Sequence, residues 1–205
     1  MKSRLAAPFV LLVLAGGIAG CTSVTSRYDL QIKKVDPARI YVCHGFDCYF
    51  KTRLDITSAD GRRFSEIMAA GAASPQAERA AISRAVQYFE TRAGEAIGVR
   101  DEAKSSFGKS GQKGQMDCID ESTNTRSLLR YLANRNLLKY HTVESNVSRG
   151  LFIDGRYPHS TAVIQEKGGV KWAVDSWYAP MGGAPDIIPL SDWLPRGVLS
   201  SGALT

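Results

Sequence analysis

Three side chains in the second half of the chain are of the types that acyl transfer requires. Cys118, His159 and Asp175 follow one another in this order. In nucleophilic catalysis an imidazole takes the thiol proton, the thiolate attacks a carbonyl carbon, and a carboxylate fixes the imidazole tautomer and stabilises its cation. These residues therefore predict a nucleophile, a general base and an orienting group. The alternative is that Cys118 is a small buried apolar residue, which is common for unpaired cysteines.

The first residues have the pattern of an export signal. Lys2 and Arg4 precede an apolar run over residues 9–14, and small residues follow it. The run is shorter than the roughly 20 apolar residues of a spanning helix, so we expect cleavage. Residues 18–21 (IAGC) resemble the lipobox of bacterial lipoproteins, which implies a lipid on Cys21 and anchoring in a bilayer. The next residue is not the Asp that favours the inner membrane in that family, so an outer-membrane anchor facing the periplasm is expected. An ordinary signal peptide is the alternative.

The remaining cysteines divide into a pair and a single thiol. Cys43 and Cys48 are close in sequence and lie between two strand-like runs, so in an oxidising compartment we expect a disulfide that clamps a hairpin. A metal site of Cys43, His44 and Cys48 is the alternative, but it supplies three ligands where structural zinc takes four. The disulfide leaves Cys118 as an odd thiol, which calls for a chemical explanation.

The elements expected around these residues are those of an α+β domain. Hydrophobic periodicity predicts the strands and helices, and Ser-Pro and Gly are typical of the start and end of a helix. The predicted elements are strands over 39–42 and 49–57, a short helix over 64–70, a helix from Ser74 and Pro75 to Gly98, a loop over 99–116, a helix from Asp117, a strand over 140–147, and strands over 160–165 and 170–175.

The helix from Asp117 carries the candidate nucleophile. Asp117 is its predicted N-cap, and Cys118 lies in its first turn. The helix dipole lowers the pKa of a thiol at this position, whereas nearby carboxylates raise it. The dipole prevails only if Asp120 and Glu121 point outward, and the sequence leaves this balance open.

The last two predicted strands form a hairpin that brings the histidine to the aspartate. A turn over 166–169 joins them. If residues 166 and 170 pair around a three-residue turn, His159 lies opposite Trp177, and Asp175 is its diagonal neighbour on the same face, within side-chain reach. A slip of one residue would put His159 and Asp175 on opposite faces.

The order of these three residues is that of the transglutaminase-like branch of the papain-like superfamily. Residues 114–120 (GQMDCID), 158–163 (PHSTAV) and 172–177 (WAVDSW) resemble the bacterial transglutaminase-like cysteine proteinases, over about 105–178 of the chain. The resemblance implies an antiparallel sheet packed on the nucleophile helix. It also implies that Cys118 is the nucleophile, and the disulfide hairpin precedes this core.

The resemblance assigns further roles. His159 would be the general base and acid, and Asp175 the orienting group. The Cys118 backbone amide would meet the oxyanion together with a side-chain donor, for which Gln112 and Gln115 are both candidates. Some members of the family bind calcium through acidic residues beside the cysteine. Here these would be Asp117, Asp120 and Glu121. Their alternative role is helix capping, and no other cofactor is expected.

The length and the net charge of the chain bear on its domain organisation and its partners. Residues 1–20 are the predicted signal peptide, 21–37 a lipidated linker and 38–205 a single transglutaminase-like domain. Removal of Lys2 and Arg4 lowers the formal charge from +6 to +4, and the remaining basic residues are scattered, so no nucleic-acid partner is expected. We expect a cell-envelope cysteine hydrolase, a peptidase or amidase that forms a thioester with a peptide or protein substrate. A catalytically inactive binding module on the envelope is the alternative.

Overall fold

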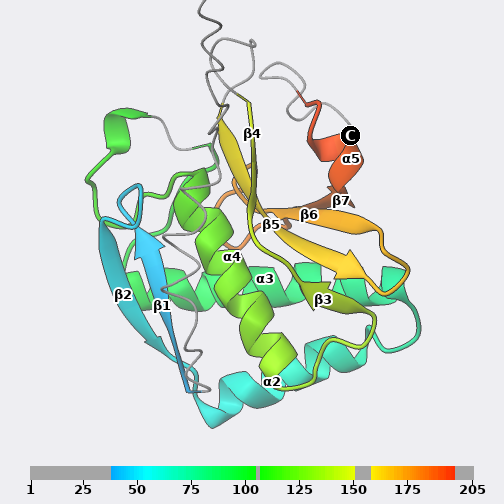
Figure 1. The fold of residues 1–205 in the computed structure, drawn as a ribbon. Helices are drawn as coiled ribbons and strands as arrows, with labels where there is room; N and C mark the ends of the chain where they lie inside the picture. The colour runs from blue at the N-terminus through cyan, green and yellow to red at the C-terminus, as the bar shows by residue number, and fades with distance from the viewer. Residues whose placement is uncertain (1–37, 105–106, 151–157, 197–205) are drawn as a thin grey trace, which may run out of the picture.

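The computed structural model describes residues 38–104, 107–150 and 158–196. The predicted signal peptide, Cys21 and the predicted linker lie outside these residues. The described chain is a mixed α+β structure (Figure 1), as the sequence predicts. Its elements in chain order are β1 Arg39–His44, β2 Phe50–Asp55, α2 Ser58–Ala69, α3 Pro75–Ile97, the 3-10 helix η1 Phe107–Lys109, α4 Cys118–Asn134, β3 His141–Val143, β4 Val147–Arg149, β5 His159–Glu166, β6 Lys171–Asp175, β7 Asp186–Pro189 and α5 Leu190–Trp193.

The main sheet is antiparallel, with β5 near its centre. Its strand order is β3-β5-β6-β7, and β4 also pairs with β5. In the β5–β6 hairpin Ala162 pairs with Val174, and the Glu166 N–H donates to the Val170 carbonyl over 2.8 Å. This is the register of the predicted three-residue turn. It sets the start of β5 beside the end of β6.

Helix α4 lies between the main sheet and the separate β1–β2 hairpin (Figure 1). It packs on β5 with one side and on β1 with another. Leu128, Leu129 and Leu132 are fully buried in the core. An apolar stripe of α3 enters the same core, with Ile82, Val86, Phe89, Ala93 and Ile97 buried.

Local signals explain where the helices begin and end. Ser74 caps α3 by accepting from Ala77 N–H, and Gly98 ends the helix in the left-handed region at φ 81°. Helix α2 starts earlier than the predicted 64–70. The reason is a capping box, in which Thr57 and Asp60 exchange side-chain and backbone hydrogen bonds.

The strand predicted over 140–147 is instead two short strands, β3 and β4. Val143 pairs with Ile164, whereas Val147 pairs with Thr161. Between these two pairs the chain advances four residues from Val143 to Val147 but only three along β5, so the β3–β4 side has one extra residue. This is the geometry of a β-bulge, which interrupts the ladder.

None of the helices in the described ranges combines the length and the apolar character that crossing a bilayer requires.

Candidate active site

Cys118 is the first residue of α4, directly after its N-cap. Asp117 accepts hydrogen bonds from the backbone N–H groups of Ile119 at 3.1 Å and Asp120 at 2.8 Å, as predicted. The Cys118 residue is partly exposed and its thiol is not in a disulfide. Its sulfur accepts from the backbone N–H of Ser160. This contact brings the sulfur to the β5 residue that follows His159.

The surroundings of Cys118 favour the thiol over the thiolate. Burial raises the pKa of Cys118 to about 12, and the charge of Asp117 adds to the rise. The helix dipole therefore does not prevail here. The outward orientation considered for Asp120 and Glu121 is wrong, because both side chains are buried.

His159 is hydrogen-bonded to Asp175. His159 Nε2 lies 2.7 Å from Asp175 Oδ2, and both side chains are buried. The same carboxylate oxygen accepts from Trp193 Nε1 at 2.7 Å. Since a carboxylate oxygen accepts, Nε2 carries the hydrogen in this pair and Nδ1 has the lone pair. Among the described residues Nδ1 is buried without a hydrogen-bond partner.

Aromatic rings surround the imidazole. Its centroid lies 4.8 Å from that of Trp177, 5.3 Å from Tyr178 and 5.6 Å from Trp193. Arg149 lies over the Trp193 ring, 4.2 Å from the centroid, and donates to the Tyr178 hydroxyl at 2.9 Å. These contacts restrict the rotation of the imidazole.

A second set of buried polar side chains begins at Ser176, the residue after Asp175. Ser176 Oγ donates to Glu121 Oε2 over 2.8 Å, and Thr125 Oγ1 lies 3.2 Å from the same hydroxyl. Glu90 of α3 accepts from Gly182 N–H at 2.8 Å. Burial raises the pKa of Glu90 to about 8, and it raises that of Glu121 well above the ordinary range, with Glu90 adding to the rise. At neutral pH these carboxyls therefore tend to keep a proton.

The two glutamines proposed for the oxyanion differ in environment. Gln112 is exposed, and its Nε2 donates to the Gly108 carbonyl at 3.3 Å. Gln115 is buried, and its Oε1 has no hydrogen-bond partner among the described residues. Gln112 and Gln115 both stay candidates for the role, at six and three residues before Cys118 in the chain.

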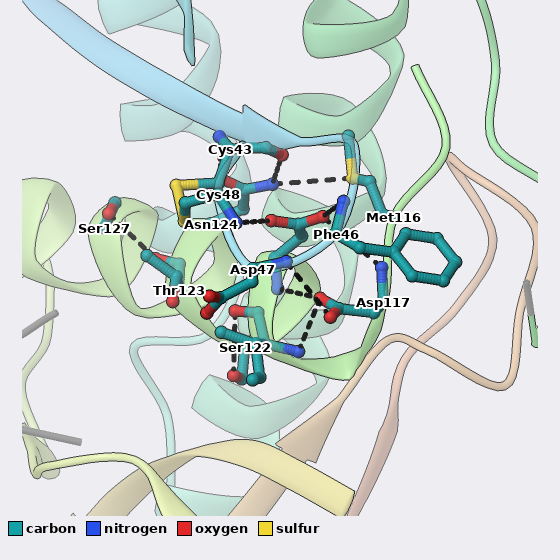
Figure 2. The surroundings of a disulfide bond; sticks show 12 residues. Cys43, Phe46, Asp47, Cys48, Met116, Asp117, Ser122, Thr123, Asn124 and Ser127 are labelled. Carbon is teal, nitrogen blue, oxygen red and sulfur yellow. Dashed lines mark hydrogen bonds between the residues drawn. A yellow bond between two sulfur atoms is a disulfide. The ribbon is translucent and has the colours of Figure 1, made fainter. Parts of the chain in front are cut away.

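The disulfide hairpin lies against the start of α4 (Figure 2). Cys43 and Cys48 are bonded, with Cα atoms 4.5 Å apart, which confirms the predicted pairing. Asn124 of α4 holds Cys43 in both directions, accepting from its N–H at 2.7 Å and donating to its carbonyl at 2.8 Å. His44, the third ligand of the alternative metal site, has a hydrogen-bonding neighbour at each ring nitrogen. Its Nε2 lies 2.8 Å from Thr52 Oγ1, and its Nδ1 accepts from Gly114 N–H.

The acidic residues beside Cys118 fit capping better than calcium. Asp117 and Asp120 form a capping box, and their oxygens face backbone N–H groups, which repel a cation. Within the described residues, Cys43, Cys48 and Asp120 bring three ligand-type atoms within 4.8 Å of one another. The two sulfurs are bonded to each other, however, and do not offer thiolates.

Sequence reasoning missed Ser176 and Glu90 as neighbours of the site, and the hydrogen bond from Trp193 to Asp175. Trp193 lies on a short helix without a periodic pattern, so its approach to Asp175 had no local signal. Ser176 lies within residues 172–177 (WAVDSW), a segment that the sequence resemblance already assigns to the site. Of the other tryptophans, Trp172 lies elsewhere, with the Arg79 guanidinium 3.6 Å from its ring centroid.

Comparison of the chain with models of protein families, with curated proteins and with solved structures finds no match.

Proposed function

We propose that this protein is a cysteine hydrolase of the bacterial cell envelope, a peptidase or amidase with Cys118 as nucleophile, His159 as general base and Asp175 as orienting group. The observation that carries the proposal is the state of the His159 ring. Nε2 is bonded to Asp175, while Nδ1 is buried without a partner among the described residues. The Cys118 sulfur accepts from the neighbouring Ser160 N–H. An imidazole that is hydrogen-bonded at one nitrogen and unpaired at the other has the lone pair that takes the proton of a thiol nucleophile.

In this mechanism the thiol and the base act together. Because the pKa of Cys118 is raised, the thiol keeps its proton at neutral pH and passes it to Nδ1 as sulfur attacks the substrate carbonyl. Asp175 and the Trp193 indole hold the ring during this step. The Cys118 amide and the side-chain amide of Gln112 or Gln115 would stabilise the oxyanion. The imidazolium then protonates the leaving amine, and water or another amine attacks the thioester.

The architecture and the amino terminus support the setting of this activity. A cysteine at the first turn of a helix, packed on an antiparallel sheet that carries histidine and aspartate, is the arrangement of the papain-like and transglutaminase-like core. The lipobox-like segment ending at Cys21 would anchor the domain to a bilayer, with the outer membrane facing the periplasm as its location. A peptide or protein of the envelope is the substrate class.

One observation favours a second function, a binding module without catalysis. The imidazole of His159 is buried, and burial raises the pKa of the Cys118 thiol to about 12. A fold that keeps the three side chains for structure would have the same features. The two functions differ in what Cys118 does to a carbonyl substrate.

The test measures turnover of a pool of fluorogenic peptides by the mature protein. We expect Cys118→Ala and His159→Ala each to lower turnover by roughly a thousandfold or more, and the double variant to lose little more, because residues that act as a unit are non-additive. Asp175→Ala should retain more activity. Ser160→Ala is the control, since it keeps the N–H that contacts the sulfur. Full activity of Cys118→Ala would reject the hydrolase.

A further inference from the structure

The loop closed by the disulfide has an unusual backbone. Four successive residues lie in the left-handed region: Gly45 at φ 88°, Phe46 at 71°, Asp47 at 52° and Cys48 at 53°. Three of them are not glycine, and such residues adopt this region at a cost in free energy. A conformation of this kind persists only where covalent bonds and contacts hold it.

The left-handed loop directs its N–H groups at the start of α4. Phe46 N–H donates to Asp120 Oδ2 at 2.8 Å, and Cys48 N–H donates to Asp120 Oδ1 at 2.6 Å. Asp47 N–H donates to Asp117 Oδ2 at 3.1 Å (Figure 2). Successive N–H groups that converge on one acceptor form a nest. Here the acceptor is the Asp120 side chain of the nucleophile helix.

Asp120 connects this loop with the residues that hold Cys118. Its side chain is fully buried and also faces Asp117 N–H at 3.4 Å, closing the capping box. Asp117 in turn caps the turn in which Cys118 lies. The sulfurs of the disulfide and an Asp120 oxygen lie within 4.8 Å of one another, and Ile119 packs against the disulfide.

We propose that Asp120 is a positioning residue for Cys118, and that it acts only while the Cys43–Cys48 disulfide holds the loop in its left-handed form. Reduction then releases the N–H groups from Asp120, loosens the first turn of α4 and exposes the thiol. The expected effect on turnover rests on the proposed function. The expected change in the reactivity of the Cys118 thiol is independent of it.

The redox step balances with a dithiol as reductant. Two electrons and two protons enter the S–S bond, which breaks to give the Cys43 and Cys48 thiols, while the dithiol closes to its own disulfide. The loop is within reach of a reductant, because Asp47 and Tyr49 on either side of Cys48 are exposed. The probe is dithiothreitol.

The experiment follows alkylation of Cys118 by iodoacetamide as a function of pH, with the labelled peptide identified by mass. In the oxidised protein the thiol should react slowly until high pH. After reduction, and in a Cys43→Ser/Cys48→Ser variant, we expect the midpoint of the profile to fall by at least one pH unit and labelling at pH 8 to rise about tenfold. Turnover should fall at least tenfold. A disulfide that merely stabilises the fold would lower the melting temperature and leave the profile of the folded protein unchanged.

Asp120→Asn tests the same link with the disulfide intact. It should shift the alkylation profile in the same direction and make the disulfide easier to reduce in a glutathione titration, because coupling between two sites is reciprocal. Asp55→Asn, at the exposed far end of the hairpin, is the control and should change neither. If the reduced protein unfolds, Asp120→Asn alone decides. Wild-type behaviour of Asp120→Asn would overturn the proposal. A shifted profile in a protein without turnover would reject the hydrolase and keep the positioning role.

Discussion

At the scale of single residues, the Asp175 carboxylate joins the parts of the candidate site. One of its oxygens accepts from both His159 Nε2 and Trp193 Nε1, each at 2.7 Å. Hydrogen bonds to a charged group are stronger than neutral ones. Two donors from different elements fix the direction of the carboxylate, and the carboxylate fixes which ring nitrogen of His159 carries a hydrogen.

The indole donor should therefore matter for turnover. We expect Trp193→Phe to lower kcat about tenfold with little change in KM, because loss of one charge-assisted hydrogen bond is worth roughly 1.5 to 3 kcal/mol and part of it orients the base. Steady-state kinetics on the peptide pool measures this effect. Trp172→Phe, at the tryptophan beside Arg79, is the control. An unchanged kcat in Trp193→Phe would show that Asp175 is held without the indole.

Part of the site follows from the sequence by register alone. The turn over 166–169 fixes the parity of the β5–β6 hairpin, and the parity puts His159 and Asp175 on one face. The N-cap role of Asp117 follows equally from its position before an apolar helix pattern. Trp193 and Glu90 approach from elements far away in sequence. Contacts of that kind depend on how whole elements pack, which no local pattern specifies.

At the scale of elements, α2 and α3 are joined through one carboxylate. Asp60 accepts from the Tyr88 hydroxyl at 2.6 Å and from Arg92 Nε at 2.9 Å, both on α3. It also closes the capping box of α2 with Thr57. Burial opposes the charge on Asp60, but these hydrogen bonds together hold its pKa well below the ordinary range.

Removal of the Asp60 carboxylate should weaken the contact between α2 and α3 and destabilise the fold. We expect Asp60→Ala to lower the free energy of unfolding by at least about 2 kcal/mol, since it removes several hydrogen bonds to a charged group and a helix cap. Urea unfolding followed by circular dichroism measures the change. Glu66→Ala, on the exposed surface of the same helix, should change it by less than about 0.5 kcal/mol. Equal effects of the two substitutions would contradict this account of Asp60.

The elements themselves were predictable where a local signal marks their ends. Ser74, Pro75 and Gly98 define α3 in the sequence as they do in the structure. The start of α2 was missed because its capping box carries Asp in place of the usual Glu or Gln. The strands β3 and β4 were predicted as one, since a bulge adds a residue without changing the apolar character of the segment. The elements β7 and α5 are short and lack a period.

At the scale of the whole molecule, several acidic groups are buried close together. Burial raises the pKa of Glu90 to about 8 and, together with the charge of Asp117, raises that of Asp120 to about 8. It also raises the pKa values of Asp117 and Glu121. Asp60 and Glu78 behave in the opposite way. Burial opposes their charge, but hydrogen bonds from Tyr88, Thr57 and Arg92 to Asp60, and from His141 and backbone N–H groups to Glu78, lower their pKa values.

These shifts predict that the folded state is most stable at mildly acidic pH. Between about pH 4.5 and 8, Glu90 and Asp120 keep protons that the unfolded chain has released, so the free energy of unfolding falls as pH rises. Each such proton contributes about 1.4 kcal/mol per pH unit. His44 has the opposite effect below about pH 6.5. Burial lowers its pKa, so the unfolded chain binds a proton there that the folded chain does not, and the free energy of unfolding rises with pH. Below about pH 4, protonation of Asp60 and Glu78 is easier in the unfolded chain, and stability is lost again.

The melting temperature of the mature protein should therefore pass through a maximum near pH 5 and decline toward pH 8. Glu90→Gln replaces a titrating carboxyl by a neutral side chain of the same shape. The melting temperature should then decline less steeply between pH 5 and 8, because one of the groups that cause the decline no longer titrates. Glu95→Gln on the same helix is the control, since its side chain is 54% exposed, and it should leave the slope as it is. A melting temperature that stays level or rises from pH 5 to 8 would mean that the N–H groups facing Asp117 and Asp120 outweigh burial and keep these carboxyls ionised. Asp120→Asn would then be expected to destabilise the folded protein at every pH above 4.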